Sequence, residues 1–256
     1  MHLVNSDIRP VIRRAPGAFG ATSVRPRHRW YPPLKFVCEW LAALLMLVPL
    51  TMLIGFLGLL VKVTSPGKAF YRQRRLGLNG KSFTMIKIRT MVENSEDGTG
   101  AVWSQPGDPR VTRIGRVLRD THLDELPQIW NVLRGEMSLV GPRPERPEIV
   151  ANLVETIPQY SDRLAVRPGL SGLAQVELPP DSNEMTVRKK LAYDLHYVAH
   201  VSPWLDVLIL VSTALYLFSS LLKALCHTLV RAYGRGAESM FRQREIIDEA
   251  SAPQTV

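Results

Sequence analysis

A long apolar run near the beginning of the chain constrains this sequence more than any other feature. From Phe36 to Val61 the residues are almost all apolar, and Glu39 is the only charged residue among them. A helix of about 20 apolar residues crosses the hydrocarbon core of a bilayer. The run is long enough for that, so we expect a membrane helix over residues 34–62.

Basic residues flank this run on both sides. They are Arg25, Arg27, Arg29 and Lys35 before it, and Lys62, Lys68, Arg72, Arg74, Arg75 and Lys81 after it. Lysine and arginine favour the cytoplasmic side of a membrane, so both ends of the run favour the same side. Pro49 lies near the middle, and a proline inside a helix kinks it. The pattern favours a re-entrant helix kinked at Pro49, and a single transmembrane helix stays open as the alternative.

A second apolar run, from Trp204 to Val230, carries a stripe of polar residues. The stripe follows helical spacing and consists of Ser202, Asp206, Thr213, Tyr216, Ser220, Lys223 and His227. It predicts an amphipathic, membrane-associated helix over 204–230, either interfacial or packed on a globular domain. Residues 1–33 are predicted to form a disordered basic tail and residues 231–256 a polar tail.

The formal net charge of +9 favours an anionic partner. Nucleic acid is the weaker choice, because no RNP-like, zinc-finger or helix-turn-helix pattern is present, so we expect no nucleic acid. Cys38 and Cys226 are isolated in the sequence, which gives no support to a zinc site. Phosphate-binding glycine-rich loops of the common nucleotide-binding types are absent as well.

The middle of the chain, residues 63–203, predicts a compact α+β domain that is mostly helical. Short strands are expected over 69–72 and 82–89, joined by a turn at 77–80. Helices are expected around 114–118 and over 126–133, the second ending at Gly135.

Two adjacent acids, Asp124 and Glu125, lie where the second of these helices is expected to begin. Pro127 belongs in a first helical turn, and Thr121 or Asp124 is the expected N-cap. Acids at such a position are more often caps than catalysts. Arginines surround them in the sequence, however, and the segment GPRPERP at 141–147 fixes some of these arginines on a backbone stiffened by proline.

Several segments resemble the bacterial sugar transferases, the monotopic phosphoglycosyl transferases that start undecaprenyl-linked glycan assembly. They are YRQRRLGLNGKSFTMIKIRTM at 71–91, GDPRVTRIGRVLRDTHLDELPQIWNVLRGEMSLVGPRPE at 107–145, VRPGLSGLAQV at 166–176 and, more weakly, YDLHYV at 193–198. The resemblance covers roughly residues 34–225.

This resemblance implies a catalytic domain over 63–203 on the cytoplasmic face of the bacterial inner membrane. The domain would transfer a sugar-1-phosphate from a UDP-sugar to polyprenyl phosphate and release UMP. Asp124 would be the nucleophile, and Glu125 would assist with Mg²⁺ or with the proton of the acceptor. We expect both acids to be the Mg²⁺ ligands, and the side chains that bind phosphate or substrate to be Arg119, Arg143, Lys87, Arg89 and Arg167.

The sequence departs from the family pattern at two places in the membrane segment. Val48 stands before Pro49, where the family has serine. The usual Lys-Arg-x-x-Asp reads Lys35-Phe36-Val37-Cys38-Glu39, without the arginine. Which sugar is transferred and whether a homodimer forms stay open. A catalytically silent scaffold that gathers anionic lipids and a metal-dependent phosphohydrolase are the alternatives to the transferase.

Overall fold

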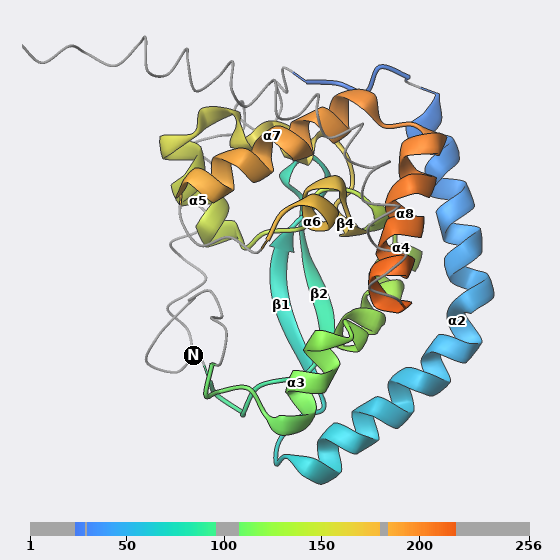
Figure 1. Cartoon of the computed structure of the whole chain (residues 1–256), viewed down its shortest axis with the longest axis vertical. Helices are drawn as coiled ribbons and strands as arrows, with labels where there is room; N and C mark the ends of the chain where they lie inside the picture. The colour runs from blue at the N-terminus through green and yellow to red at the C-terminus, as the bar shows by residue number, and fades with distance from the viewer. Residues whose placement is uncertain (1–23, 29, 96–107, 180–183, 219–256) are drawn as a thin grey trace, which may run out of the picture. The chain divides into compact units, whose positions relative to one another are not determined.

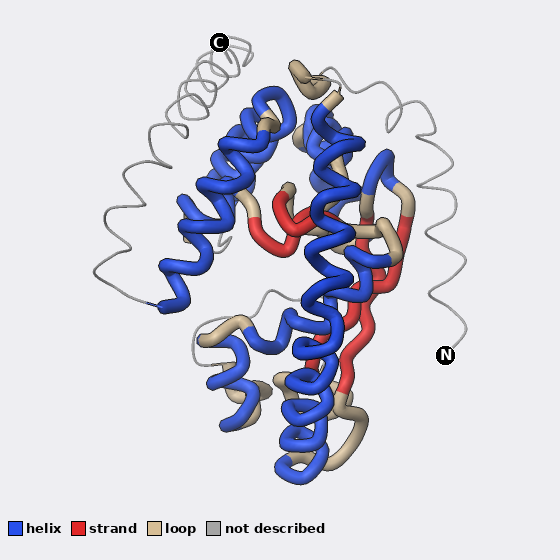
Figure 2. Tube along the Cα trace, turned by 90° about the vertical axis from the view of Figure 1, so that its right-hand side faces the viewer, coloured by secondary structure: helices blue, strands red, loops and turns tan. Residues whose placement is uncertain are grey.

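The computed structural model describes residues 24–28, 30–95, 108–179 and 184–218, which form two compact units (Figure 1). Unit 1 comprises residues up to 37, residues 75–83 and residues from 136 onwards, and unit 2 comprises residues 38–74 and 84–135. Helices predominate and the strands are short (Figure 2). The expected α+β, mostly helical class is confirmed.

The membrane segment folds as one continuous helix, α2, from Tyr31 to Thr64, through Pro49. It begins three residues before and ends two residues after the predicted range of 34–62. Its 34 residues correspond to a length of about 51 Å, against about 30 Å of hydrocarbon in a bilayer. Figure 1 shows that α2 changes direction part-way along its length, which agrees with a proline inside the helix.

Most of the apolar surface of α2 is exposed. Only 22% of its most apolar window is buried, and α2 is long and apolar enough to cross a membrane. Its buried side chains Ile54, Leu57 and Val61 recur every three or four residues, so they form one buried face within unit 2. A core helix of a water-soluble domain would be buried on most sides, so the exposed apolar remainder of α2 fits a membrane location.

Unit 2 contains most of a β-hairpin and three short helical segments. The hairpin pairs β1 (Phe70–Leu76) with β2 (Ser82–Ile88) through the turn η1 (Leu78–Gly80). Two strands joined by a turn were predicted, but β1 extends four residues beyond the predicted end at residue 72. Helix α3 (Arg113–Asp120) follows, with the Thr112 hydroxyl accepting a hydrogen bond from Gly115 N at 2.9 Å as an N-cap. The chain then continues through η2 (Leu123–Gln128) into α4 (Ile129–Leu133).

The start of the second helix differs from the sequence-based expectation. Thr121 is not its N-cap but ends α3, since its hydroxyl donates to the Val117 carbonyl at 2.7 Å. Asp124 lies inside the 3-10 segment η2, and the residue before that segment, His122, is left-handed (φ 56°) and makes no side-chain cap. Because Pro127 has no N–H to donate, regular α-helix begins only after it, at Ile129.

Unit 1 is built around two short parallel strands, β3 (Ser138–Val140) and β4 (Gly169–Ser171), paired Ser138 to Gly169 and Val140 to Ser171. Its helices are α5 (Pro147–Thr156), η3 (Pro158–Ala165), α6 (Leu173–Glu177), α7 (Glu184–His200) and α8 (Pro203–Phe218). Buried side chains of α7 contribute to two core clusters of the described part of unit 1, for example Tyr197 to one and Leu195 to the other.

A buried polar network joins the first turns of α2 to α7 and α8. Asp206 accepts hydrogen bonds from the Tyr31 hydroxyl at 2.5 Å, Lys35 Nζ at 2.7 Å and the Tyr197 hydroxyl at 2.7 Å. Tyr31 therefore belongs to the folded unit, although the sequence predicted a disordered tail up to residue 33. Residues 1–23 of that tail lie outside the described part of the chain.

Helix α8 buries apolar residues such as Leu205 and Ile209 in the core of unit 1, together with polar residues, and it exposes further apolar residues. Asp206 is buried, and the Thr213 hydroxyl lies 2.6 Å from the Ser171 hydroxyl, so both polar residues face the protein. Trp204, Val207 and Val211 are the exposed ones, at 60%, 50% and 42%. Asp206 and Thr213 of the predicted polar stripe thus contact the globular domain, whereas Tyr216 is 52% exposed, and the amphipathic arrangement over 204–230 stays a prediction. Positions after 218, including the predicted polar tail, lie outside the described residues.

Candidate active site

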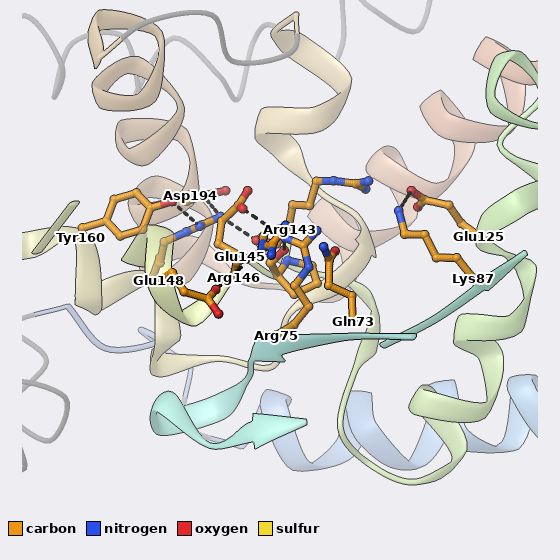
Figure 3. Close-up of polar contacts among 12 residues, drawn as sticks. Gln73, Arg75, Lys87, Glu125, Arg143, Glu145, Arg146, Glu148, Tyr160 and Asp194 are labelled. Atoms are coloured by element: carbon orange, nitrogen blue, oxygen red, sulfur yellow. Dashed lines mark hydrogen bonds and ion pairs between the residues drawn. The ribbon is translucent and has the colours of Figure 1, made fainter. Parts of the chain in front are cut away.

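The two predicted catalytic acids lie together in unit 2, on η2. Asp124 is buried, with 7% of its surface exposed. Glu125 Oε1 lies 2.6 Å from Lys87 Nζ, and both side chains of this pair are largely buried. Figure 3 shows Lys87 and Glu125 pointing toward one another. The structure thus brings three of the predicted site residues, Lys87, Asp124 and Glu125, to one place.

Strand β2 and helix α4 hold this pair in position. Asn131 of α4 donates from Nδ2 to the Thr84 carbonyl at 2.8 Å and accepts from Ile86 N at 3.4 Å. Asn131 is fully buried, so these bonds form away from competing water. They fix η2 and α4 against the strand that carries Lys87.

Arg89, two residues after Lys87, contacts the end of the membrane helix. Its guanidinium donates to the carbonyls of Ser65 at 2.9 Å and Pro66 at 2.6 Å, directly after α2 ends. The side chain is buried. The structure shows Arg89 fixing the end of α2 to β2, and the predicted phosphate-binding role stays a prediction.

Arg119 of α3 donates from Nε to the Thr90 hydroxyl at 2.8 Å. The Thr90 carbonyl in turn accepts from Thr112 N at 3.0 Å. Gly115 packs so closely on that carbonyl that any side chain at position 115 would collide with it. Helix α3 is thereby held against the residue that follows β2.

The membrane helix packs onto the element that carries the acids. Leu57 and Val61 of α2 form a buried cluster with Ile88 and Leu118. Leu123 and Leu126, which flank the acids on η2, pack against this cluster. The acids are therefore attached, through one apolar core, to the helix that is long and apolar enough to cross a membrane.

The other predicted arginines lie in unit 1, where the GPRPERP segment is held by hydrogen bonds to its backbone. Arg163 donates to the Arg143 carbonyl at 2.8 Å, and Arg75 donates to the Pro144 carbonyl at 3.1 Å. Arg75 also contacts Glu145 at 3.1 Å. These bonds fix the backbone from which Arg143 projects (Figure 3).

Arg163 is a buried cation with a buried partner. Asp194 Oδ2 lies 2.7 Å from its Nη2, and the Tyr160 hydroxyl accepts from its Nη1 at 2.7 Å. Burial alone would lower the pKa of Arg163, but the charge of Asp194, the interactions with Tyr160 and Glu145 and the hydrogen bond to Asp194 together outweigh burial, so the pKa is raised. Arg163 is therefore permanently charged.

Arg167 lies in a segment adjacent to the GPRPERP backbone. Gly169 N donates to the Pro142 carbonyl at 3.0 Å, and Ser138 N donates to the Pro168 carbonyl at 2.8 Å. The structure thus brings the backbones that carry Arg143 and Arg167 together within unit 1.

The family model of the bacterial sugar transferases matches residues 30–220 of this chain. The chain belongs to this family. It is 42% identical, over 72% of its length, to a UDP-N-acetylgalactosamine-undecaprenyl-phosphate N-acetylgalactosaminephosphotransferase of Aeromonas hydrophila, and the match covers 43% of that protein. It is 43% identical, over 70% of its length, to a UDP-glucose:undecaprenyl-phosphate glucose-1-phosphate transferase of Caulobacter vibrioides, with 67% of that protein covered.

A third relative is the exopolysaccharide production protein PSS of Rhizobium leguminosarum bv. phaseoli. It is 40% identical over 68% of this chain, and the match covers 88% of that protein. This sugar transferase spans less than half of the length of the Aeromonas protein.

Residues that the sequence analysis missed are mainly buried partners of the predicted ones. Asp194 lies in the weakly matching YDLHYV segment, and Asn131 lies between Trp130 and Val132 in an apolar run. A polar residue inside an apolar helical face is the signal that would have found both of them.

The described residues contain no group of three or more His, Cys, Asp or Glu side chains arranged to hold a metal ion. Mg²⁺ commonly binds through one or two carboxylates together with substrate phosphates. The buried carboxylate of Asp124 and the adjacent Glu125 supply oxygen donors of that kind, so the sugar transferase fits Mg²⁺ without a dedicated protein cage.

Proposed function

We propose that this sugar transferase moves a sugar-1-phosphate from a UDP-sugar to undecaprenyl phosphate on the cytoplasmic face of the bacterial inner membrane. The product would initiate assembly of an exopolysaccharide, O-antigen or glycoprotein glycan. The observation that carries the proposal is the Lys87–Glu125 pair beside the buried Asp124, on an element packed against a lipid-exposed helix. Relatives named as undecaprenyl-phosphate sugar phosphotransferases support it.

In the first step, a carboxylate oxygen of Asp124 attacks the phosphorus that carries the sugar. The new O–P bond forms as the bond to the bridging oxygen breaks, and UMP leaves with that oxygen. In the second step, a phosphate oxygen of the lipid attacks the same phosphorus. The Asp124–phosphorus bond breaks, the carboxylate is restored, and the product is a polyprenyl diphosphate sugar.

Cations offset the repulsion between a carboxylate nucleophile and a diphosphate. Lys87 is held beside the site by Glu125, and its charge stabilises the ionised carboxylate of Glu125 in return. Arg119, and in unit 1 Arg143, are the proposed phosphate ligands. The backbone of Arg143 is fixed by Arg163, which limits the entropy lost when phosphate binds.

Mg²⁺ is the proposed cofactor, bound through Asp124 and Glu125 with the substrate diphosphate. When bound, it would withdraw charge from the phosphate oxygens. The side chains have separate roles in this proposal. Asp124 is the nucleophile, Lys87 provides a positive charge, and Glu125 holds Lys87 in place through their hydrogen bond.

For the membrane helix we propose the re-entrant arrangement with its kink at Pro49. Helix α2 is longer than a bilayer core requires, it contains Pro49, and basic residues flank both of its ends. The exposed apolar face of α8 is proposed to rest on the same membrane surface. Single cysteines introduced at Arg27 and Ser65, in a background without Cys38 and Cys226, test this. Labelling of both from the cytoplasmic side supports it, whereas labelling from opposite sides establishes a spanning helix.

The transferase itself is tested with purified protein, Mg²⁺ and a panel of UDP-sugars, with and without polyprenyl phosphate. We expect UMP release with at least one donor and transfer of the labelled sugar phosphate to the organic phase when the lipid is added. Release of sugar phosphate into water regardless of lipid would instead establish a phosphohydrolase. Binding to acidic vesicles with no turnover of any donor would establish a scaffold.

A further inference from the structure

The indole of Trp40, on α2, contacts the short helix that follows the catalytic acids. Its Nε1 donates to the Leu133 carbonyl at 3.0 Å, and Leu133 is the last residue of α4. The carbonyls of a last helical turn have no partner within their own helix, so α2 supplies a donor to the end of α4. Both residues belong to unit 2.

Helix α4 continues directly from η2, the segment that carries Asp124 and Glu125. With five residues, α4 is too short to be stable by itself. Its place is therefore set by contacts with other elements. Asn131 attaches its middle to the backbone of β2, and Trp40 attaches its last residue to α2. A shift of α4 would move η2 and the two acids with it.

Helix α2 contacts the same element a second time, beyond Pro49. Leu57 and Val61 belong to the buried apolar cluster against which the leucines of η2 pack. One contact therefore holds the segment at η2 and the other holds it at the end of α4. The acids lie between two attachments to a single helix, one on each side of Pro49.

The bend of α2 relates to these two contacts. Trp40 and Leu57 are 17 positions apart on α2, which is about 26 Å along a straight helix. Figure 1 shows that α2 changes direction part-way along its length. A bend between the two contact points brings them closer together than a straight helix would. Pro49 lies between them, so the bent form of α2 suits an element as short as η2 with α4.

We propose that Trp40 is a positioning residue for the catalytic acids, which acts by fixing the end of α4 through the Leu133 carbonyl. The proposal rests on the proposed function, and it makes the bent membrane helix part of the framework of the active site. A reacting group that is displaced by about 1 Å can lose up to about a hundred-fold in rate. Loose attachment of α4 should therefore reduce the rate of the chemical step more than the binding of the donor.

The test compares Trp40→Phe, which removes the N–H, with Trp40→His, whose Nε2 occupies the same position of a five-membered ring. The kcat for UMP release and the KM for the nucleotide sugar are measured in detergent micelles with Mg²⁺. Trp40→Phe should lower kcat about three- to thirty-fold and change the donor KM by less than about two-fold. Trp40→His should be more active than Trp40→Phe, although its ring is smaller, because it keeps the donor.

Two control variants remove side-chain surface without touching α4. Trp204→Phe makes the same substitution at a tryptophan of α8 that is 60% exposed, and Leu45→Ala truncates a side chain of α2 that is 81% exposed. Both variants should keep kcat and the donor KM within about two-fold of the wild type, as is usual for exposed positions.

Backbone hydrogen exchange gives a measurement that needs no turnover. Trp40→Phe should speed exchange over residues 129–135 about two- to ten-fold, the effect of one hydrogen bond on local opening. Exchange over α7, in unit 1, should keep the wild-type rate. If the wild type turns over no UDP-sugar, the proposed function fails in the wild type itself, and the exchange rates still decide whether Trp40 holds α4.

Three outcomes overturn the proposal. One is an unchanged kcat together with unchanged exchange in Trp40→Phe. Another is a lower kcat in Trp40→His than in Trp40→Phe, which would assign the effect to lost packing. The third is equally faster exchange over α7, which would mean that the whole protein is destabilised. Thermal unfolding identifies a variant that has failed to fold, and if Trp40→Phe is that variant, a folded Trp40→His with more than half of the wild-type kcat supports the proposal.

Discussion

Lys87 Nζ lies 2.6 Å from Glu125 Oε1, and this ion pair joins strand β2 to the 3-10 segment η2 one residue after Asp124. The two side chains are only 17% and 12% exposed. At such burial, removal of one partner leaves the other charge poorly solvated. The pair therefore controls both the position and the electrostatic surroundings of the neighbouring acid.

Replacing Asp124 by Asn should abolish UMP release, because an amide oxygen is a far weaker nucleophile toward phosphorus than a carboxylate. We expect a loss of at least about a thousand-fold in kcat, measured by chromatography of released UMP, and no phosphosugar attached to the protein. Asp120→Asn is the matched control, since Asp120 is an exposed acid at the end of α3. Full UMP release by Asp124→Asn would show that the nucleophile is another group.

The Lys87–Glu125 contact can be measured with a double-mutant cycle of Lys87→Gln and Glu125→Gln. Each single change should lower kcat/KM by roughly ten- to a hundred-fold, and the coupling energy should be about 1–3 kcal/mol, typical of residues in one network. Additive effects, with a coupling energy near zero, would mean that the two side chains act independently.

Arg89→Lys should weaken the attachment of the end of α2. Lysine cannot reproduce the two hydrogen bonds to the carbonyls of Ser65 and Pro66. The expected loss is about 1–3 kcal/mol in the free energy of unfolding, measured by thermal unfolding in detergent. Arg72→Lys, on the exposed part of β1, is the control and should change stability little. Equal shifts in both variants would contradict the assignment.

Asp206→Ala should destabilise the protein strongly, by about 3–5 kcal/mol, because the buried cation of Lys35 loses the carboxylate that lies 2.7 Å from its Nζ. Thermal unfolding measures the loss. The double variant Lys35→Met, Asp206→Leu removes both charges and should recover a large part of it. If the double variant is as unstable as the single one, lost packing rather than the lost ion pair causes the effect.

Stability should fall in mild acid because of His196. Burial, and to a lesser extent the charge of His200, lower the pKa of His196 to about 4 from its usual 6.5. The depressed pKa means that the unfolded chain binds a proton more readily. The penalty is absent above about pH 6.5 and grows as the pH falls toward 4, reaching about 2 kcal/mol at pH 5. His196→Gln should remove this part of the pH dependence in unfolding experiments at pH 8 and pH 5, whereas an unchanged slope would show that another group titrates.

The local features of this chain follow from short-range patterns in its sequence. The apolar run predicted α2 and the alternation of apolar and polar residues predicted the hairpin, because burial and backbone geometry act on residues close together in the chain. The acids Asp124 and Glu125 and the stiff segment at 141–147 were found in the same way. The start of η2 was mispredicted because the left-handed His122 leaves no clear sequence signal.

Which residues far apart in the sequence contact each other was decided by the tertiary structure alone. Lys87 and Glu125 are 38 positions apart, and Lys35 and Asp206 are 171 apart. No local pattern specifies which of many cations meets a given acid, since that choice depends on how separate elements pack. The sequence by itself determined the membrane helix, the acids and the basic surroundings. The tertiary structure decided that Arg89 fixes the end of α2, that Arg163 fixes the GPRPERP segment, and that the Arg167 guanidinium lies over the Phe36 ring, because each contact requires packing across distant segments.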